Sequence, residues 1–394
     1  MKPMHYDVIV VGGGPAGSAA AATLAGAGCS VLVLEKSKHP RHKSCGGGLS
    51  ARLLPFLDHD VKEIIEQTVY HVCFRLKQKE VTFSSTTPVA YLVRRPHFDA
   101  YLADKAAAAG AEIREECPML RWRELPDGVE VESRFGKETG SFLIAADGGT
   151  SRIARQLHAQ WKKKLAYSLE AETPFPHPGM SNRGETKYQE TVFIDLTVSK
   201  GYGWVFPKTG EAAIGIGGFK GKEKRPQLLY RHFLSRNGLL SERASAPPHG
   251  SVIPFYHGPR FPLAKGRTLL IGDAGSLVDP LFGEGLYYAI RSGQMAAGAV
   301  IAALKKGIPI RSYDEEVRSV FYPEFEVARK IAYWVYSFPW VFLEANRWHP
   351  GAMELYFGVL RGERSYKAFW KEVRWEFLRK WNPFRQSSAA SSRP

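Results

Sequence analysis

Residues 6–35, YDVIVVGGGPAGSAAAATLAGAGCSVLVLE, determine how the rest of the chain is organised. The apolar run Tyr6–Val11 predicts a buried β-strand, and an alanine-rich helix follows the glycines to about Ala27. A second apolar strand, Ser30–Leu34, leads to the acidic residue Glu35. Strand, glycine loop, helix, strand and acid in this order predict a βαβ unit that binds a dinucleotide.

Each glycine of the loop has a separate role in holding a pyrophosphate. Gly12 permits the tight turn, Gly14 lets the pyrophosphate approach the backbone, and Gly17 lets helix and strand pack closely. The helix N-terminus offers unpaired N–H groups and the positive end of its dipole. A carboxylate at Glu35 can accept hydrogen bonds from both hydroxyls of an adenosine ribose. We therefore predict cofactor contacts at Gly12, Gly14, Pro15, Ala16, Gly17, Glu35 and Lys36.

The composition limits the class of protein. At 394 residues, with 44% hydrophobic and 24% charged residues, the chain can hold two globular domains and a third subdomain. The net charge of +15 comes without a nucleic-acid-binding motif, which favours an anionic lipid surface or a phosphorylated substrate over nucleic acid. The four cysteines form no CxxC pair, so neither a metal site nor a disulfide framework is predicted.

The sequence carries no pattern for export or membrane insertion. The first strand begins almost at once, which leaves no room for a signal or transit peptide. No uninterrupted apolar run reaches the roughly 18 residues of a spanning helix. We expect a cytoplasmic protein, or one bound peripherally to the inner face of the cell membrane.

Two more turns follow apolar strands farther along the chain. The strand 142–146 ends at Asp147, and the strand 268–271 ends close to Asp273. Asp147 either caps the following turn or touches the cofactor indirectly. A helix of small residues, from about Leu286 to Leu304, follows the second turn.

The glycine loop with Glu35 and the turns at Asp147 and Asp273 stand in the order found in FAD-dependent oxidoreductases of the aromatic hydroxylase type, which most of the chain resembles. The resemblance implies that FAD is the cofactor and that the first motif holds its ADP half. Asp273 would bind the ribityl chain, and the backbone at Gly285 and Leu286 would face the pyrimidine edge of the flavin. A helix N-terminus there would stabilise the negative charge of reduced flavin.

Three stretches resemble the geranylgeranyl reductases within that group. Cys45–Ser50 resembles their cysteine–glycine loop, Tyr202–Pro207 resembles their Tyr-x-Trp-x-Phe-Pro motif in the substrate cavity, and Pro280–Ala289 resembles their flavin-proximal helix entrance. Lys43 and Ser44 stand where many members have a proline. The resemblance implies cofactor contacts at Cys45, Gly46, Gly48, Arg95, Asp273, Gly285 and Leu286, substrate contacts at Tyr202, Trp204, Pro207 and Phe282, and catalytic roles for Cys45 and Tyr202.

Several of these residues have a second, purely structural interpretation. Cys45 either fills a loop or presents a thiol to flavin and substrate and helps to deliver a proton. Tyr202 and Trp204 share one face of a strand, where they either pack in the core or contact a polyprenyl chain.

The last third of the chain, 311–381, is predicted to be helical and is rich in aromatic and basic residues. Its segment 331–343 is either a core helix with a break near Pro339 or a surface that admits a lipid. Basic and aromatic residues alternate over 361–381, which favours contact with a bilayer interface.

We predict an α/β (α+β) fold in three parts. The three parts are a Rossmann-like FAD-binding domain (1–68, 94–160 and 264–310), an antiparallel β-sheet substrate domain (69–93 and 161–263) and a C-terminal helical region (311–385). A disordered tail (386–394) is predicted to follow them.

The leading functional hypothesis is a reductase that hydrogenates C=C bonds of a geranylgeranyl or other polyprenyl chain, carried by a lipid, a diphosphate or a quinone tail. Hydride from N5 of reduced flavin would go to one alkene carbon and a proton to the other. Because an isolated alkene accepts hydride poorly, the site needs a placed acid and must exclude water. NAD(P)H or a ferredoxin-like carrier would supply the electrons.

Two alternatives stay open at this point. One is an FAD-dependent monooxygenase or halogenase, and the other is a non-catalytic prenyl-lipid carrier. The isoprenoid, the number of double bonds reduced, the electron donor, the proton donor and the oligomeric state are not determined by these motifs.

Overall fold

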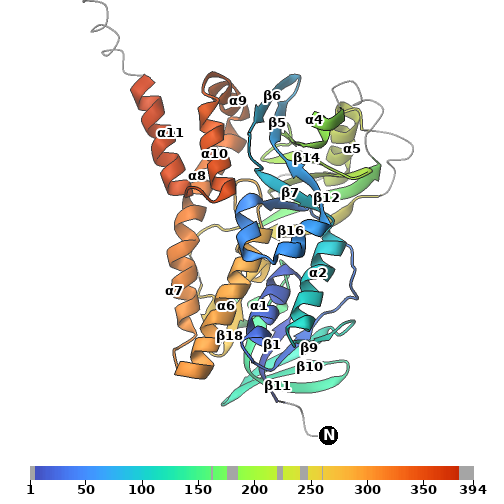
Figure 1. Cartoon of the computed structure of the whole chain (residues 1–394), viewed down its shortest axis with the longest axis vertical. Helices are drawn as coiled ribbons and strands as arrows, with labels where there is room; N and C mark the ends of the chain where they lie inside the picture. The colour runs from blue at the N-terminus through green and yellow to red at the C-terminus, as the bar shows by residue number, and fades with distance from the viewer. Residues whose placement is uncertain are drawn as a thin grey trace, which may run out of the picture.

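The computed structural model describes residues 5–160, 163–174, 185–219, 225–239, 247–259 and 261–380. The chain forms an eight-stranded sheet and a seven-stranded sheet. Figure 1 shows the first sheet with its helices at one end of the molecule, the second sheet at the other end, and the C-terminal helices along one side. This is the predicted mixed α/β fold. The tail predicted to be disordered, 386–394, lies outside the described residues, and the division into domains stays a prediction.

The eight-stranded sheet is built around a parallel core. β1 (His5–Val11), β2 (Val31–Leu34), β8 (Glu112–Arg114), β11 (Gly136–Ala145) and β18 (Thr268–Leu270) pair in parallel in the order β18-β11-β1-β2-β8. β9 (Met119–Leu125), β10 (Gly128–Ser133) and β17 (Ala264–Lys265) add antiparallel pairings. Where these strands run side by side at the centre of the sheet, at Val8–Val11, Val31–Leu34 and Phe142–Ala145, they are apolar and buried, because both faces of the sheet are covered there.

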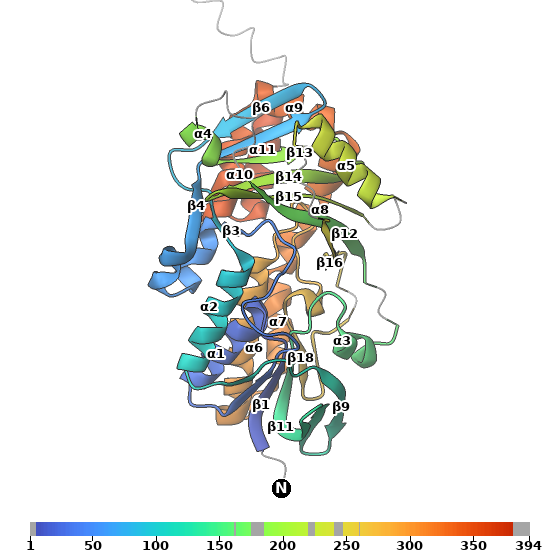
Figure 2. The ribbon, with the colours of Figure 1, turned by 90° about the vertical axis from the view of Figure 1, so that its right-hand side faces the viewer.

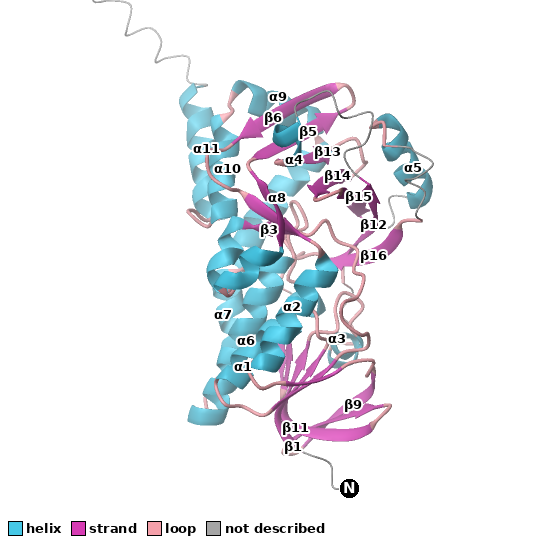
Figure 3. Ribbon diagram, turned by 45° about the vertical axis from the view of Figure 1, so that its right-hand side comes forward, coloured by secondary structure: helices cyan, strands magenta, loops and turns pink. Residues whose placement is uncertain are grey.

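Helices cover this sheet. They are α1 (Pro15–Gly26), α2 (Arg95–Ala108) and α6 (Leu286–Lys306), and a short helix α3 (Arg152–Leu157) follows β11. Of these helices, α1 is the richest in small residues. α1, α2 and α6 lie side by side in Figure 3. A Cβ at Gly293 of α6 would lie 2.3 Å from the carbonyl oxygen of Ala16 in α1. The two backbones therefore touch, and the glycine loop lies close to the N-terminal half of α6.

The seven-stranded sheet has the order β16-β12-β15-β14-β13-β5-β6, and only β13 and β5 pair in parallel (Figure 2). Its strands are β5 (His71–Leu76), β6 (Lys79–Ser84), β12 (Leu165–Pro174), β13 (Thr191–Asp195), β14 (Gly201–Lys208), β15 (Glu211–Phe219) and β16 (His249–Pro254). α4 (Glu185–Gln189) and α5 (Pro226–Arg236) belong to the same region.

A three-stranded sheet links the two larger ones. It contains β3 (Gly48–Ser50), β4 (Ile65–Val69) and β7 (Ala90–Val93), in the order β3-β7-β4. Short 3-10 helices span Ala51–Phe56, His59–Ile64 and Gly272–Gly275. β3 continues directly from the cysteine–glycine loop, so this small sheet holds the loop beside the seven-stranded sheet.

The C-terminal region is helical, as predicted, with α7 (Arg311–Val320), α8 (Tyr322–Ser337), α9 (Pro339–Trp348), α10 (Gly351–Arg361) and α11 (Tyr366–Lys380). The break near Pro339 is confirmed, because α8 ends at Ser337 and α9 begins at Pro339. The interpretation of 331–343 as a core helix is only half right. Val335 is buried, but Tyr333 and Trp334 are 65% and 57% exposed.

Candidate functional site

The glycine loop has the close backbone contacts that its sequence requires. Gly12 has φ +108°, and a Cβ there would lie 2.3 Å from the carbonyl oxygen of Ala146. A Cβ at Gly17 would lie 1.9 Å from the carbonyl oxygen of Gly12. Among the described residues no side chain caps the N-terminus of α1, so its first N–H groups face the loop and are available to an anion.

Glu35 lies beside this loop, as predicted. Its side chain is buried, and its two oxygens accept hydrogen bonds from the backbone N–H groups of Gly13 (2.7 Å) and Ser37 (3.0 Å). These bonds fix the carboxylate at the end of β2, where a ribose would lie. Lys36 is exposed, and its contact with the cofactor stays a prediction.

Arg41 is a candidate site residue that the sequence analysis missed. Its Nη2 lies 3.3 Å from the position of a Cβ on Gly14, and its guanidinium is within 3.6 Å of Glu35 and 3.3 Å of Asp99. The cation therefore stands at the glycine where a pyrophosphate would approach. Arg41 occupies an irregular polar stretch, and nothing in the local pattern places it at the loop.

The turn at Asp273 meets both helices, as the predicted site requires. A Cβ at Gly272 would lie 3.1 Å from Cβ of Ala16, and the Asp273 Oδ1 lies 3.8 Å from the position of a Cβ on Gly285. The first and third motifs, about 260 residues apart, therefore form one site.

Lys163 is a second residue that sequence reasoning missed. Its Nζ donates hydrogen bonds to the carbonyl oxygens of Asp273 (3.2 Å) and Ala274 (2.8 Å). Burial lowers the pKa of Lys163 to about 8, against the opposing effects of Asp147 and Asp273. A cation thus lies at the turn predicted to bind the ribityl chain.

Two buried polar atoms at these turns have no partner among the described residues: Oδ1 of Asp147 and Oγ of Ser276. The other oxygen of Asp147 accepts from the N–H groups of Arg152 (2.8 Å) and Ile153 (3.3 Å), so the capping interpretation of Asp147 is confirmed. A dinucleotide with hydroxyl groups would satisfy such atoms. The residues present therefore fit FAD.

The cysteine–glycine loop packs on the aromatic motif of β14. A Cβ at Gly46 would lie 2.6 Å from the ring of Phe206, and one at Gly48 would lie 3.2 Å from it. Just after the loop, Ser50 and Arg52 both bind the carboxylate of Glu284, at the entrance to α6. The three stretches that resemble the geranylgeranyl reductases are therefore in contact with one another.

Arg95 is buried and forms a bidentate ion pair with Asp99, with distances of 2.8 and 2.9 Å. Cys45 interacts electrostatically with the same guanidinium. Arg95 therefore lies beneath the surface, in contact with the cysteine–glycine loop through Cys45. Its predicted contact with the flavin phosphates stays a prediction.

The predicted substrate residues form an aromatic cluster. The Tyr202 hydroxyl donates to the carbonyl oxygen of Phe282 (2.5 Å), and its ring lies 5.7 Å from that of Trp204 and 5.9 Å from that of Phe282. Tyr336 of α8 is parallel to Tyr202 at 6.4 Å, and its hydroxyl donates to the carbonyl oxygen of Leu281. Pro207 is buried near the end of the same strand, β14.

The same face of the seven-stranded sheet carries buried charges that the sequence analysis did not select. Glu170 of β12 is 1% exposed, and Glu172 pairs with the buried Lys208 at 2.7 Å. Burial raises the pKa of Glu170 to about 8, and the nearby Glu172 adds to this increase. The sequence signal that could have indicated these residues is the presence of two acids, Glu170 and Glu172, in a strand whose other residues are uncharged.

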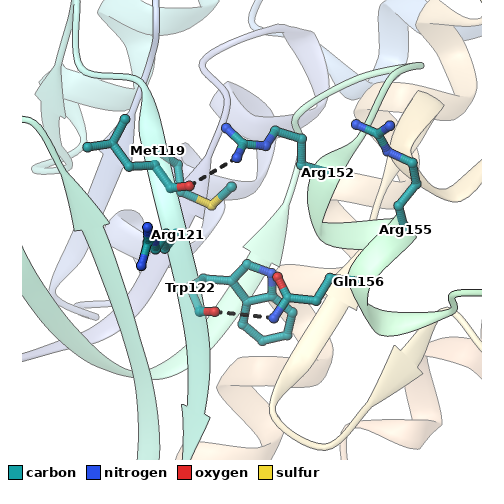
Figure 4. Close-up of a pocket in the computed structure, with 7 residues that line it drawn as sticks. Met119, Arg121, Trp122, Arg152, Arg155 and Gln156 are labelled. Atoms are coloured by element: carbon teal, nitrogen blue, oxygen red, sulfur yellow. Dashed lines mark hydrogen bonds between the residues drawn. The ribbon is translucent and has the colours of Figure 1, made fainter.

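A surface hollow of about 500 Å³ lies elsewhere, between β9 and α3 (Figure 4). Arg121, Arg152 and Arg155 line it, and Arg152 donates to the carbonyl oxygen of Leu120 (3.2 Å). None of the predicted site residues lines this hollow, so it is separate from the site formed by the motifs.

Two further findings concern ligands and membranes. Among the described residues, no His, Cys, Asp and Glu side chains gather in a group that could hold a metal ion. None of the helices in the described part has both the length and the apolar character to cross a membrane.

Comparison with protein families and with relatives of this chain identifies the cofactor domain and similar reductases. Residues 5–195 match the model of an FAD binding domain. A digeranylgeranylglycerophospholipid reductase of Methanopyrus kandleri is 32% identical over 355 residues, which cover 84% of this chain and 90% of that protein. A menaquinone reductase of Mycolicibacterium smegmatis is 31% identical over 319 residues, covering 74% and 75%.

Solved structures share the fold. A geranylgeranyl bacteriochlorophyll reductase-like protein of Thermoplasma acidophilum is 25% identical, with a TM-score of 0.72 over 83% of this chain and 87% of that one. A flavin-dependent brominase also has a TM-score of 0.72, over 96% of this chain and 100% of that one, but it is 19% identical and shows the fold alone.

Proposed function

The chain belongs to the geranylgeranyl reductase family of FAD-dependent oxidoreductases, and we propose that it hydrogenates C=C bonds of a geranylgeranyl or related polyprenyl chain. The observation that carries this proposal is the meeting of the cysteine–glycine loop, the aromatic face of β14 and the N-terminus of α6. The relatives named above act on a digeranylgeranyl phospholipid and on menaquinone, which favours a lipid or quinone tail as the substrate here.

The residues of the site suit this reaction. When bound, the flavin supplies the hydride. Tyr202, Trp204 and Phe282 form an apolar wall that would hold an isoprenoid chain and keep water away. The N-terminus of α6 begins at Gly285 without a side-chain cap among the described residues, so its dipole can stabilise negative charge at the cofactor.

We propose further that α8 and α9 bind an anionic membrane surface, from which the substrate enters. Tyr333, Trp334, Trp340 and Trp348 are each more than half exposed on these helices. Trp and Tyr prefer the interface of a bilayer, and the net charge of +15 favours anionic lipids. Tyr336, two residues after Trp334 and so on the other side of α8, stacks on Tyr202. The same helix therefore contacts both the exposed surface and the apolar wall.

An anaerobic incubation tests the reaction. The FAD-loaded protein is reduced with dithionite and incubated with geranylgeranyl phospholipid, geranylgeranyl diphosphate and menaquinone, and products are analysed by mass spectrometry. We expect mass gains in steps of two hydrogens. If the bound flavin is reduced normally but no prenyl compound gains mass, the proposal is wrong. Oxygen- and halide-dependent product formation would instead support a monooxygenase or halogenase.

Vesicle sedimentation tests the membrane surface. The double variant Trp334→Ser/Trp340→Ser should lose binding to vesicles of phosphatidylglycerol and phosphatidylcholine. Phe135→Ser is the matched control, because Phe135 is 60% exposed on a hairpin at the far end of the molecule. Equal vesicle binding by both variants would contradict a membrane surface on α8 and α9.

A further inference from the structure

Glu170 is a buried acid that the predicted chemistry does not use. It lies on β12, is 1% exposed, and its Oε2 has no hydrogen-bond partner among the described residues. A buried, incompletely paired carboxylate is unfavourable, and such groups hold their proton instead. Glu170 therefore holds a proton inside the protein, and its position relative to the predicted substrate residues decides whether that proton can be used.

The register of the seven-stranded sheet places Glu170 on the substrate face, which is the face that carries the predicted substrate residues Tyr202 and Trp204. β12, β15 and β14 are neighbours in the sheet (Figure 2). Glu170 is opposite Gly215 of β15, and Gly215 is opposite Trp204 of β14. A Cβ at Gly215 would lie 2.2 Å from the indole ring of Trp204, so the ring extends across this glycine. Directly paired residues point to the same side of a sheet, so Glu170 shares a face with Tyr202 and Trp204.

Cys45 lies close to Glu170 on this face of the sheet. The backbone amide of Cys45 interacts with the Glu170 carboxyl group, and the Cys45 side chain interacts with Arg95. The loop that carries Cys45 packs on Phe206, two residues beyond Trp204 on the same face. Glu170 is therefore next to the backbone of the residue whose thiol is predicted to face the flavin and the substrate.

Tyr202 is less suited to supply the proton. Its hydroxyl hydrogen is already donated to the carbonyl oxygen of Phe282, and burial raises the pKa of Tyr202 further above its ordinary range. Losing that proton would leave a buried phenolate. Glu170 differs, since its pKa of about 8 is close to neutral pH, where an acid can both donate and regain a proton.

We propose that Glu170 is the proton reservoir of this site and acts through Cys45. This inference rests on the proposed hydrogenation. As hydride adds to one alkene carbon and the π bond breaks, the other carbon takes the proton of the Cys45 thiol. The resulting thiolate takes the carboxyl proton of Glu170, and the carboxylate then regains a proton from solvent. Electrons come only with the hydride, so the residues return to their starting state.

Several charged and titratable groups set the protonation of Glu170. Burial is the main cause of its raised pKa, and Glu172 raises it further, whereas Lys208, Arg95 and the Cys45 amide lower it. Tyr230 of α5 also lies within electrostatic reach, and His249 of β16 is its register partner on the other side. Removing Glu172 should therefore lower the pKa of Glu170, and removing Lys208 should raise it.

Infrared difference spectroscopy of the FAD-loaded protein tests the protonation state without any prenyl substrate. We expect the C=O band of a protonated carboxyl group at pH 6.5, and its loss with a midpoint at about pH 8. Glu170→Gln should lack this band. Glu172→Gln is the matched control and should keep the band with a lower midpoint. A band that survives in Glu170→Gln, or is missing in the wild type, would overturn the assignment.

Multiple-turnover reduction with excess dithionite tests the role, because Glu170 must reprotonate the Cys45 thiolate before each further turnover. Wild-type rates should fall about tenfold for each pH unit above 8, whereas Glu170→Gln should be about 100-fold slower at pH 7 and lose this dependence. If Glu170→Gln keeps the rate and pH profile of an active wild type, the reservoir role fails and the proposed function stands. If the wild type reduces no prenyl compound, the proposed function fails and the proton transfer with it.

Discussion

The raised pKa of Glu170 also predicts a pH-dependent stability. The folded protein holds a proton on Glu170 that the unfolded chain releases above its ordinary pKa of 4.5. The stabilisation by this proton is complete below pH 4.5 and is lost as the pH rises towards 8. The difference between these values corresponds to about 5 kcal/mol of unfolding free energy, as an upper bound.

Glu170→Gln removes this titration, so its stability relative to wild type should increase with pH. A buried amide in place of the acid adds an offset of about 1–3 kcal/mol that does not change with pH. A 394-residue protein that unfolds as one unit has an unfolding entropy of about 0.8 kcal/mol per kelvin. About 4 kcal/mol of this loss falls between pH 5 and pH 8.5, so the Tm difference should increase by up to about 5 °C over that range.

The assay is calorimetric unfolding of the FAD-loaded variant and wild type over this pH range. Glu130→Gln is the control, because Glu130 lies on a strand but pairs with Arg123 at the surface, which lowers its pKa. Its Tm difference should stay small over the same range. A constant Tm difference between Glu170→Gln and wild type would refute the reasoning, since it would mean that Glu170 is ionised in the folded protein.

Three further variants test the geometry of the site. Gly17→Ala should lose bound FAD, seen as lost flavin absorbance, because its Cβ would lie 1.9 Å from a carbonyl oxygen, whereas Gly26→Ala, with open space, should keep it. Gly215→Ala should displace the indole of Trp204 and lower kcat/KM for the prenyl substrate at least tenfold, while the flavin content stays unchanged. An unchanged kcat/KM would contradict a role of the apolar wall in holding the substrate. Glu284→Ala should lower the unfolding free energy by about 3–5 kcal/mol, because Arg52 would be left buried without its partner, and a loss below 1 kcal/mol would contradict this.

Local patterns predicted the parts of the site that depend on local backbone geometry. The glycine loop, the acid at Glu35, the cap at Asp147 and the helix after Gly285 each follow from residues within one turn of the feature. These features need a positive φ, a close approach or a free helix terminus, and few residue types satisfy them. The break near Pro339 belongs to the same group.

The missed residues depend on contacts between distant segments. Arg41 reaches Asp99, Lys163 reaches the carbonyl groups of the turn at Asp273, and Glu170 is placed by pairing with β15 and by the cysteine loop. In each case the residue alone is an ordinary polar side chain in a loop or strand. Only the tertiary arrangement buries it and gives it a partner.

The buried charges of the substrate face are poor contributors to stability. Pairs such as Lys208 with Glu172 lose hydration on burial, and apolar residues of similar volume often stabilise a protein as well or better. Glu170 has the weaker position, since one of its oxygens has no partner among the described residues. An apolar side chain at this position would fit the strand at lower cost in free energy. The physical argument for an acid at position 170 is therefore its proton, held beside Cys45 on the face where a carbon must be protonated.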